Sequence, residues 1–159
     1  MQSRDPQSNS AYAVGMIRNR SVLTDTLLPH IVYRDLAGAI EWLTRAFGYV
    51  EHYRYGDPLS GSQGQLGNAC IMLTASRGGD HRSPAETGFA TQSLTVFLEE
   101  VEAHCAHAKG TGAVIVEEPH ETVYGEFQYA AKDPEGHLWL FSRHARDVSP
   151  ASWGATIVH

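Results

Sequence analysis

The sequence has little of what several common functions require. Only 12 of its 159 residues are Lys or Arg, against 18 Asp or Glu, and the formal net charge is −6. Because phosphate binding needs clustered basic side chains, and these are scattered along the chain, we expect no nucleic-acid partner. No apolar run approaches the roughly 20 residues of a membrane-spanning helix, so we expect no membrane association.

Cysteine and recognisable catalytic motifs are also scarce. The two cysteines, Cys70 and Cys105, fall in different expected elements, and there is no CxxC pair to suggest zinc or redox chemistry. The polar first ten residues lack the apolar core of a signal peptide, so we expect a cytoplasmic protein with two unpaired, buried thiols. No phosphate-binding glycine loop, Ser-His-Asp order or pair of carboxylates stands out.

What the sequence does contain is an internal repeat. Residues 27–34 have the β-branched and aromatic content of a strand, and Asp35 follows as the N-cap of a helix that ends at Gly48. Three further strands are expected at 49–55, 62–66 and 69–74. A stretch rich in Gly, Ser and Pro follows, and the same order then returns. The second half is expected to contain a strand at 93–98, a helix at 100–109, a strand at 113–117, a loop at 119–125, and strands at 127–132 and 137–142.

This repetition predicts an α+β fold of two βαβββ modules, whose curved mixed sheets form a cup with the helices on the outer face. We expect an N-terminal arm at 1–24 and one domain at 25–159. The domain divides into module one (25–76), a linker (77–91), module two (92–144) and a C-terminal tail (145–159).

Strand alternation divides each sheet into two faces. One face of each sheet must cover its own helix, and side chains alternate along a strand, so Ile31, Tyr33, Trp139 and Phe141 are expected to face the helices. The remaining positions would line the cup, and they are mostly apolar: Leu28, His30, Cys70, Met72, Ser93, Thr95, Phe97, Leu138 and Leu140. An apolar hollow with few polar groups suits a small organic ligand.

Several stretches resemble one known family. The first strand with Asp35, the helix ending Ala46-Phe47-Gly48, and above all 124–126 (Tyr-Gly-Glu) followed by 133–139 (Asp-Pro-Glu-Gly-His-Leu-Trp) are similar to the vicinal oxygen chelate superfamily. That superfamily contains glyoxalases, bleomycin resistance proteins and extradiol dioxygenases. The resemblance covers residues 18–154 and implies the same fold, with half-sheets that pair within or between chains, so we expect a homodimer.

The resemblance also locates where the enzymes of that family hold a metal. The four ligand positions fall here at Leu28, Met72, Ser93 and Leu140. None carries an imidazole or a carboxylate, and a lone hydroxyl is a poor ligand for a divalent metal. The resemblance is therefore to the non-metal branch, which binds and sequesters antibiotics, and we expect no metal and no cofactor.

Other side chains are candidates for the walls and rim of the cup. His30 is either a ligand contact or an inner-wall histidine, and Glu126 is either a general base or a solvated rim carboxylate. His104 and His107, spaced i, i+3 on the second helix, are interpreted as boundary residues, and His137 as structural. The complete predicted ligand-binding set is Leu28, His30, Val32, His52, Arg54, Met72, Ser93, Thr95, Phe97, Tyr124, Glu126, Gln128, Leu138 and Leu140.

The sequence thus predicts a metal-free protein that binds a partly aromatic organic molecule, such as an antibiotic or a metabolite. The alternative is a lyase, isomerase or dioxygenase-type enzyme that uses a metal on a changed ligand set, such as His30 with Glu126. Metal-free acid–base catalysis by either residue is a third possibility.

Overall fold

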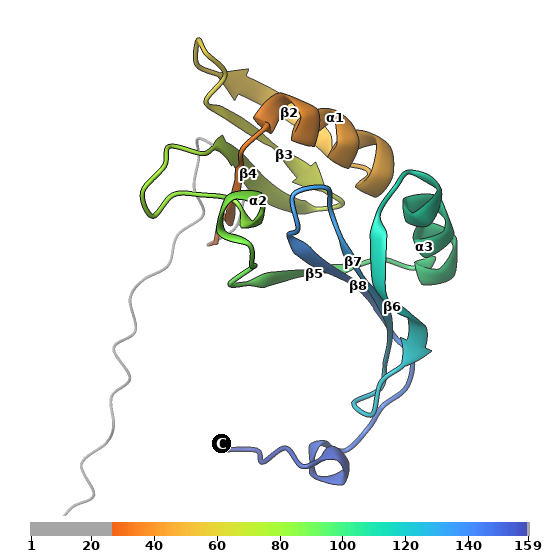
Figure 1. Cartoon of the computed structure of the whole chain (residues 1–159). Coiled ribbons are helices and arrows are strands. Elements are labelled where there is room, and N and C mark those ends of the chain that lie inside the picture. The colour runs from red at the N-terminus through yellow and green to blue at the C-terminus, as the bar shows by residue number, and fades with distance from the viewer. Residues whose placement is uncertain (1–26, 159) are drawn as a thin grey trace, which may run out of the picture.

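The computed structural model describes residues 27–158 and contains two βαβββ modules (Figure 1). Each module is one four-stranded mixed sheet covered by a helix on one face, with strand orders β1-β4-β3-β2 and β5-β8-β7-β6. The predicted α+β fold is confirmed. Module one consists of β1 (His30–Tyr33), α1 (Leu36–Phe47), β2 (Val50–Tyr55), β3 (Gly61–Leu66) and β4 (Ala69–Ala75). Module two consists of β5 (Ser93–Phe97), α3 (Val101–Gly110), β6 (Val114–Glu121), β7 (Glu126–Lys132) and β8 (Leu138–His144).

Local sequence signals set the bounds of α1. The Asp35 carboxylate accepts a hydrogen bond from the Gly38 N–H at 3.0 Å, which satisfies one free donor of the first turn. The helix ends at Gly48, whose φ of 78° lies in the left-handed region that glycine adopts without steric cost. Both features agree with the prediction from sequence.

β6 and the linker differ from their predictions, as do the ends of β1 and β8. β6 continues to Glu121, so the loop expected at 119–125 begins later, because irregular pairing with β7 extends the ladder to Glu121. Within the linker, α2 (Pro84–Thr87) forms a single helical turn, which the glycine-rich composition did not predict. The Glu86 carboxylate accepts a hydrogen bond from the N–H of Ser83 at 2.8 Å and thereby stabilises this turn.

The two modules share one hydrophobic core. As expected from strand alternation, Ile31, Tyr33, Trp139 and Phe141 are buried on the helix-covered faces. Phe47, at the end of α1, packs against the rings of Trp139 and Phe141 at centroid distances of 5.5 and 4.7 Å. Helix α1 of module one therefore contributes directly to the core of module two.

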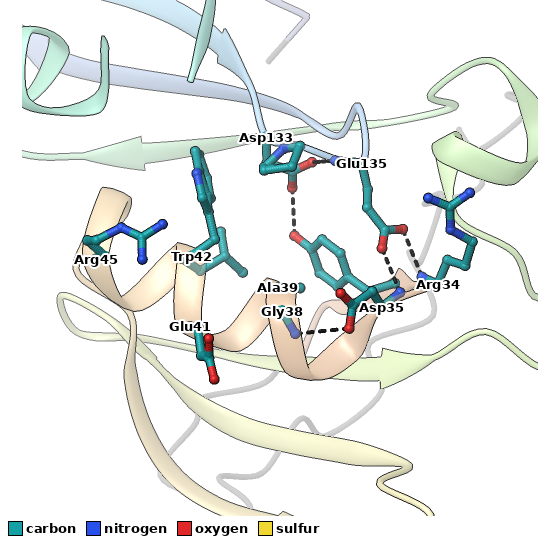
Figure 2. Close-up of a pocket in the computed structure, with 12 residues that line it drawn as sticks. Arg34, Asp35, Gly38, Ala39, Glu41, Trp42, Arg45, Asp133 and Glu135 are labelled. Carbon is teal, nitrogen blue, oxygen red and sulfur yellow. Dashed lines mark hydrogen bonds between the residues drawn. The ribbon is translucent and has the colours of Figure 1, made fainter. Parts of the chain in front are cut away.

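The turn between β7 and β8 joins the modules through hydrogen bonds (Figure 2). Buried Asp133 accepts from the Tyr33 hydroxyl at 2.7 Å and from the Trp139 indole N–H at 3.1 Å. Glu135 accepts the backbone N–H groups of Arg34 and Asp35, both at 2.7 Å. Burial, reinforced by the nearby Asp133 charge, raises the pKa of Tyr33 well above its usual value, so this phenol stays a donor.

His137 completes this connection, which supports its interpretation as a structural residue. Its Nε2 donates to the carbonyl oxygen of Val32 at 2.8 Å, and its ring packs edge-on against Tyr33. The motif at 133–137 thus fixes the start of α1 against module two. A cavity of about 290 Å³ lies beside it, between α1 and the turn.

Candidate functional site

Each sheet has one face without a helix, and these two inner faces carry most of the predicted ligand-binding residues. On module one the parallel pairing of β1 with β4 places His30 beside Met72. On module two the pairing of β5 with β8 places Ser93 beside Leu138 and Thr95 beside Leu140. The strands therefore present these side chains as two compact patches.

The inner face of module one is partly covered by the linker. His30 and Val32 line a cavity of about 250 Å³ together with Asp80, Arg82 and Phe89 of the linker. His30 is exposed, Val32 is half-buried, and Met72 is buried beside them. The cavity could take a small ligand next to an imidazole, and its covering segment was not predicted as part of the site.

A second cavity, of about 270 Å³, lies between the modules. It is mostly apolar and contains Cys70 of module one and Thr95 of module two, with Leu66, Leu94 and Trp139 among its walls. Two residues of the expected lining, one from each module, therefore do meet in one cavity.

The inner face of module two is open to solvent. Phe97 has 72% of its surface exposed, Ser93 and Thr95 are exposed, and Leu138 and Leu140 are half-buried. Phenylalanine is a residue type that folding normally buries. Among residues 27–158, the inner face of module two therefore leaves Phe97 exposed beside the half-buried Leu138 and Leu140, and we call this face the open wall.

One end of this open wall is polar. Glu126 accepts a hydrogen bond from the hydroxyl of buried Ser142 at 3.1 Å, and its other oxygen lies 3.7 Å from Nδ1 of His144. The Tyr124 hydroxyl donates to the side-chain oxygen of Gln128 at 3.1 Å. Glu126, Gln128 and Tyr124 were predicted from sequence, whereas Ser142 and His144 were not.

Strand alternation in the sequence could have placed Ser142 and His144 on the inner face. Ser142 and His144 continue the alternation of Leu138 and Leu140 along β8, so they lie on the same face. The predicted strand ended at 142, and extending it by two residues adds His144 to the inner face.

The expectation that His52 and Arg54 share the inner face is wrong for Arg54. His52 donates to the Gln63 side chain at 3.1 Å, but a bulge between Glu51 and Tyr53 breaks the alternation of β2. Arg54 instead lies on the α1 side, where it forms an ion pair with Glu51 at 2.5 Å. Arg54 therefore leaves the candidate set.

The histidines of α3 serve helix packing, in line with their interpretation as boundary residues. Nδ1 of His104 lies 2.7 Å from the Tyr129 hydroxyl, and its ring stacks on Phe47. His107 Nε2 donates to the carbonyl oxygen of Arg45 at 2.7 Å. Burial lowers the pKa of His104 and raises that of Tyr129.

The residues at the positions that the resemblance assigns to metal ligands do not fit a metal ion. Leu28, Met72 and Leu140 have no ligating nitrogen or oxygen in their side chains, and exposed Ser93 has only a neutral hydroxyl. Over residues 27–158, no three His, Cys, Asp or Glu side chains gather in a way that could hold a metal. His30 and Glu126 belong to different modules.

The fold and the two inner faces define a member of a known class. A family model described as glyoxalase/bleomycin resistance protein/dioxygenase superfamily matches residues 25–141, and the chain belongs to this superfamily. Rv0887c of Mycobacterium tuberculosis, an uncharacterized protein, is 26% identical over 134 residues, covering 77% of this chain and 76% of its own. Mb0911c of Mycobacterium bovis, also uncharacterized, is 26% identical and is covered over 86% of its length.

Solved structures show the same fold. TioX from Micromonospora sp. ML1 is 26% identical with a TM-score of 0.62, over 74% of this chain and 97% of TioX. A bleomycin-binding protein in complex with bleomycin is 19% identical with a TM-score of 0.59, over 76% of this chain and 99% of its own. The fosfomycin resistance protein FosX from Listeria monocytogenes is 15% identical with a TM-score of 0.58, over 77% of this chain and 93% of FosX.

Among the described residues, no helix is both long and apolar enough to cross a membrane.

Proposed function

We propose that this protein binds a small, partly aromatic organic molecule on the inner faces of its sheets without using a metal. The proposal depends on Leu28, Met72, Ser93 and Leu140, which the resemblance to the family places where its enzymes hold a metal and which offer no imidazole or carboxylate. Three of these four side chains are apolar, so the chain presents mainly apolar surface at these positions. Apolar surface of this kind stabilises a bound hydrophobic ligand by about 25 cal/mol per Å² removed from water.

The open wall of module two supports the further proposal that two copies of the chain complete the cup. Phe97, Leu138 and Leu140 form an apolar surface that the single chain leaves uncovered. In a homodimer, the inner face of module two from one chain would lie opposite the inner face of module one from its partner. A ligand would then be enclosed between the wall that carries His30 and Met72 and the wall that carries Phe97 and Leu140.

The side chains of the walls and the fold neighbours support a proposal for the class of ligand. The bleomycin-binding protein shares this fold, and an antibiotic or a metabolite of similar character is the ligand class that we propose here. Phe97 and Tyr124 offer aromatic surfaces for a planar group, while His30 and Gln128 offer hydrogen bonds.

The competing function is catalysis with a metal on a changed ligand set. His30 with Glu126 would need a third ligand, and the two residues would have to meet across the cup. Metal analysis of protein purified without chelator separates the two proposals. Stoichiometric iron, nickel, zinc or manganese that is lost in His30→Ala would refute metal-free binding.

Direct binding is the positive test. Thermal-shift screening against hydrophobic antibiotics and aromatic metabolites, followed by isothermal titration of hits, should give stoichiometric binding. The Leu140→Asp variant should lose it, because a carboxylate in the apolar wall must be desolvated by the ligand. Failure of every hydrophobic compound, together with turnover of a small polar metabolite, would contradict the proposal.

A further inference from the structure

The cavity of about 270 Å³ between the modules, here called the intermodule cavity, differs in charge from the two cavities of similar volume. Among the described residues that line it, none is Asp, Glu, Lys, Arg or His. The cavity beside α1 includes Glu41 and Arg45, and the cavity over β1 includes Arg82. An ion that entered the intermodule cavity would lose its hydration without gaining a charged partner, so this cavity favours an uncharged ligand.

The floor of the intermodule cavity is apolar. Leu66 and Ile71 of module one and Trp139 of module two are all buried there. The indole N–H of Trp139 already donates to Asp133 at 3.1 Å. Trp139 therefore offers a ligand the surface of its ring rather than a hydrogen bond.

The mouth of the intermodule cavity is polar but uncharged. Asn68, in the turn between β3 and β4, and Thr95 of β5 are both exposed and both belong to the lining. Their amide and hydroxyl groups can donate and accept hydrogen bonds. An apolar floor with a few polar groups at the mouth is the usual arrangement of a site for a small organic molecule.

The volume of the intermodule cavity suits an aromatic molecule. Protein interiors leave few voids that are larger than a water molecule. An apolar cavity of about 150 Å³ stays dry and binds benzene. At about 270 Å³, the intermodule cavity has room for two fused aromatic rings.

We infer that the intermodule cavity is a second binding site, which takes an uncharged bicyclic aromatic molecule with one hydroxyl or carbonyl group at the mouth. The rings would lie against Ile71 and Trp139, and the polar group would bond to Asn68 or Thr95. The site lies between the modules of one chain. It therefore goes beyond the proposed function on the inner faces and needs no partner chain.

A pair of probes tests the polarity of the site. Isothermal titration at pH 7 compares 2-naphthol, which is uncharged, with 2-naphthoate, which carries a carboxylate on the same ring system. The full chain should bind 2-naphthol. Because the carboxylate would be desolvated without a charged partner, 2-naphthoate should bind roughly 10-fold or more weakly.

The two cysteines locate the bound probe in the wild-type chain. Cys70 and Cys105 are 4% and 3% exposed, but Cys70 belongs to the cavity lining and Cys105 does not. N-ethylmaleimide should therefore alkylate Cys70 faster than Cys105, which mass spectrometry of peptides would measure. At about ten times its Kd, 2-naphthol should slow the alkylation of Cys70 about 10-fold and leave that of Cys105 unchanged.

Two variants of matched size locate the site by mutation. Thr95→Phe places a ring at the mouth and should weaken 2-naphthol binding roughly 10-fold or more. Val116→Phe is the control, because valine and threonine are similar in size and Val116 is exposed on β6 outside the cavity lining. Phenylalanine is well tolerated in strands, so both variants should fold, and the control should keep the wild-type affinity.

The outcomes separate this inference from the proposed function. The inference is wrong if 2-naphthol does not bind, if Cys70 reacts no faster than Cys105, or if Thr95→Phe keeps the wild-type affinity. Binding that leaves Cys70 unprotected also overturns it. If that binding is lost in Phe97→Ser, the probe lies on the open wall, so the proposed function is supported while the second site is refuted.

Discussion

Replacing Asp133 should lower the stability of the whole domain, because this one carboxylate joins the two modules. Its Oδ2 accepts from Tyr33 and Trp139, and its Oδ1 accepts the backbone N–H groups of Glu135 and His137, both at 3.0 Å. Asp133 is 3% exposed, and Tyr33 and Trp139 are almost completely buried. Asp133→Ala would therefore leave buried donors without an acceptor.

The magnitude follows from the number of donors that are left unpaired. Each buried donor that loses its partner costs about 1–3 kcal/mol, and truncation of a buried charged partner typically costs 3–5 kcal/mol in total. We therefore expect Asp133→Ala to lose about 4 kcal/mol of the free energy of unfolding, a large share of the roughly 5–15 kcal/mol of a typical domain. Asp133→Asn, which keeps Oδ1 as an acceptor, should lose less.

Urea unfolding followed by tryptophan fluorescence measures this loss as a shift of the midpoint at unchanged slope. Tyr33→Phe is the matched variant, since it removes one donor and leaves the carboxylate in place, and it should cost about 1 kcal/mol. In the double variant the two losses should not add, because both act on one hydrogen bond. A loss below about 1 kcal/mol in Asp133→Ala would refute the role assigned to this turn.

The remaining predictions concern the open wall, the buried histidine and the linker. Phe97→Ser should change the unfolding free energy by less than about 0.5 kcal/mol, because the side chain is 72% exposed, yet weaken dimerisation in light scattering. Burial lowers the pKa of His104, so the unfolded chain binds a proton at a higher pH than the folded chain. The free energy of unfolding should therefore be independent of His104 above about pH 6.5 and should decrease below it, which a series of unfolding curves would measure. The His104→Phe variant should lose this part of the pH dependence. Glu86→Ala should destabilise the single turn α2, which amide hydrogen exchange across the linker would detect as faster exchange.

The architecture was predictable because each half repeats the same local signals. Asp35 and Gly48 delimit α1 by capping chemistry, and strand alternation correctly assigns Ile31 and Trp139 to the core. Such signals act over a few residues and do not depend on the rest of the chain. The order of elements within each βαβββ module therefore follows from the sequence alone.

The candidate site was less predictable, because it depends on irregular pairing and on packing between distant segments. The bulge in β2 moves Arg54 away from the inner face, and no local residue pattern indicates this bulge. The position of the linker over His30 and the pairing of Ser142 with Glu126 are tertiary effects. Exposure of Phe97 is likewise a property of the folded chain rather than of its alternation pattern.

We propose that the inner faces bind an organic ligand without a metal. The most direct measurement is isothermal titration of one identified ligand into protein that has been dialysed against EDTA, with metal content determined on the same sample. We expect the same affinity and stoichiometry before and after metal removal. Binding that disappears on chelation and returns on addition of one divalent metal would contradict it.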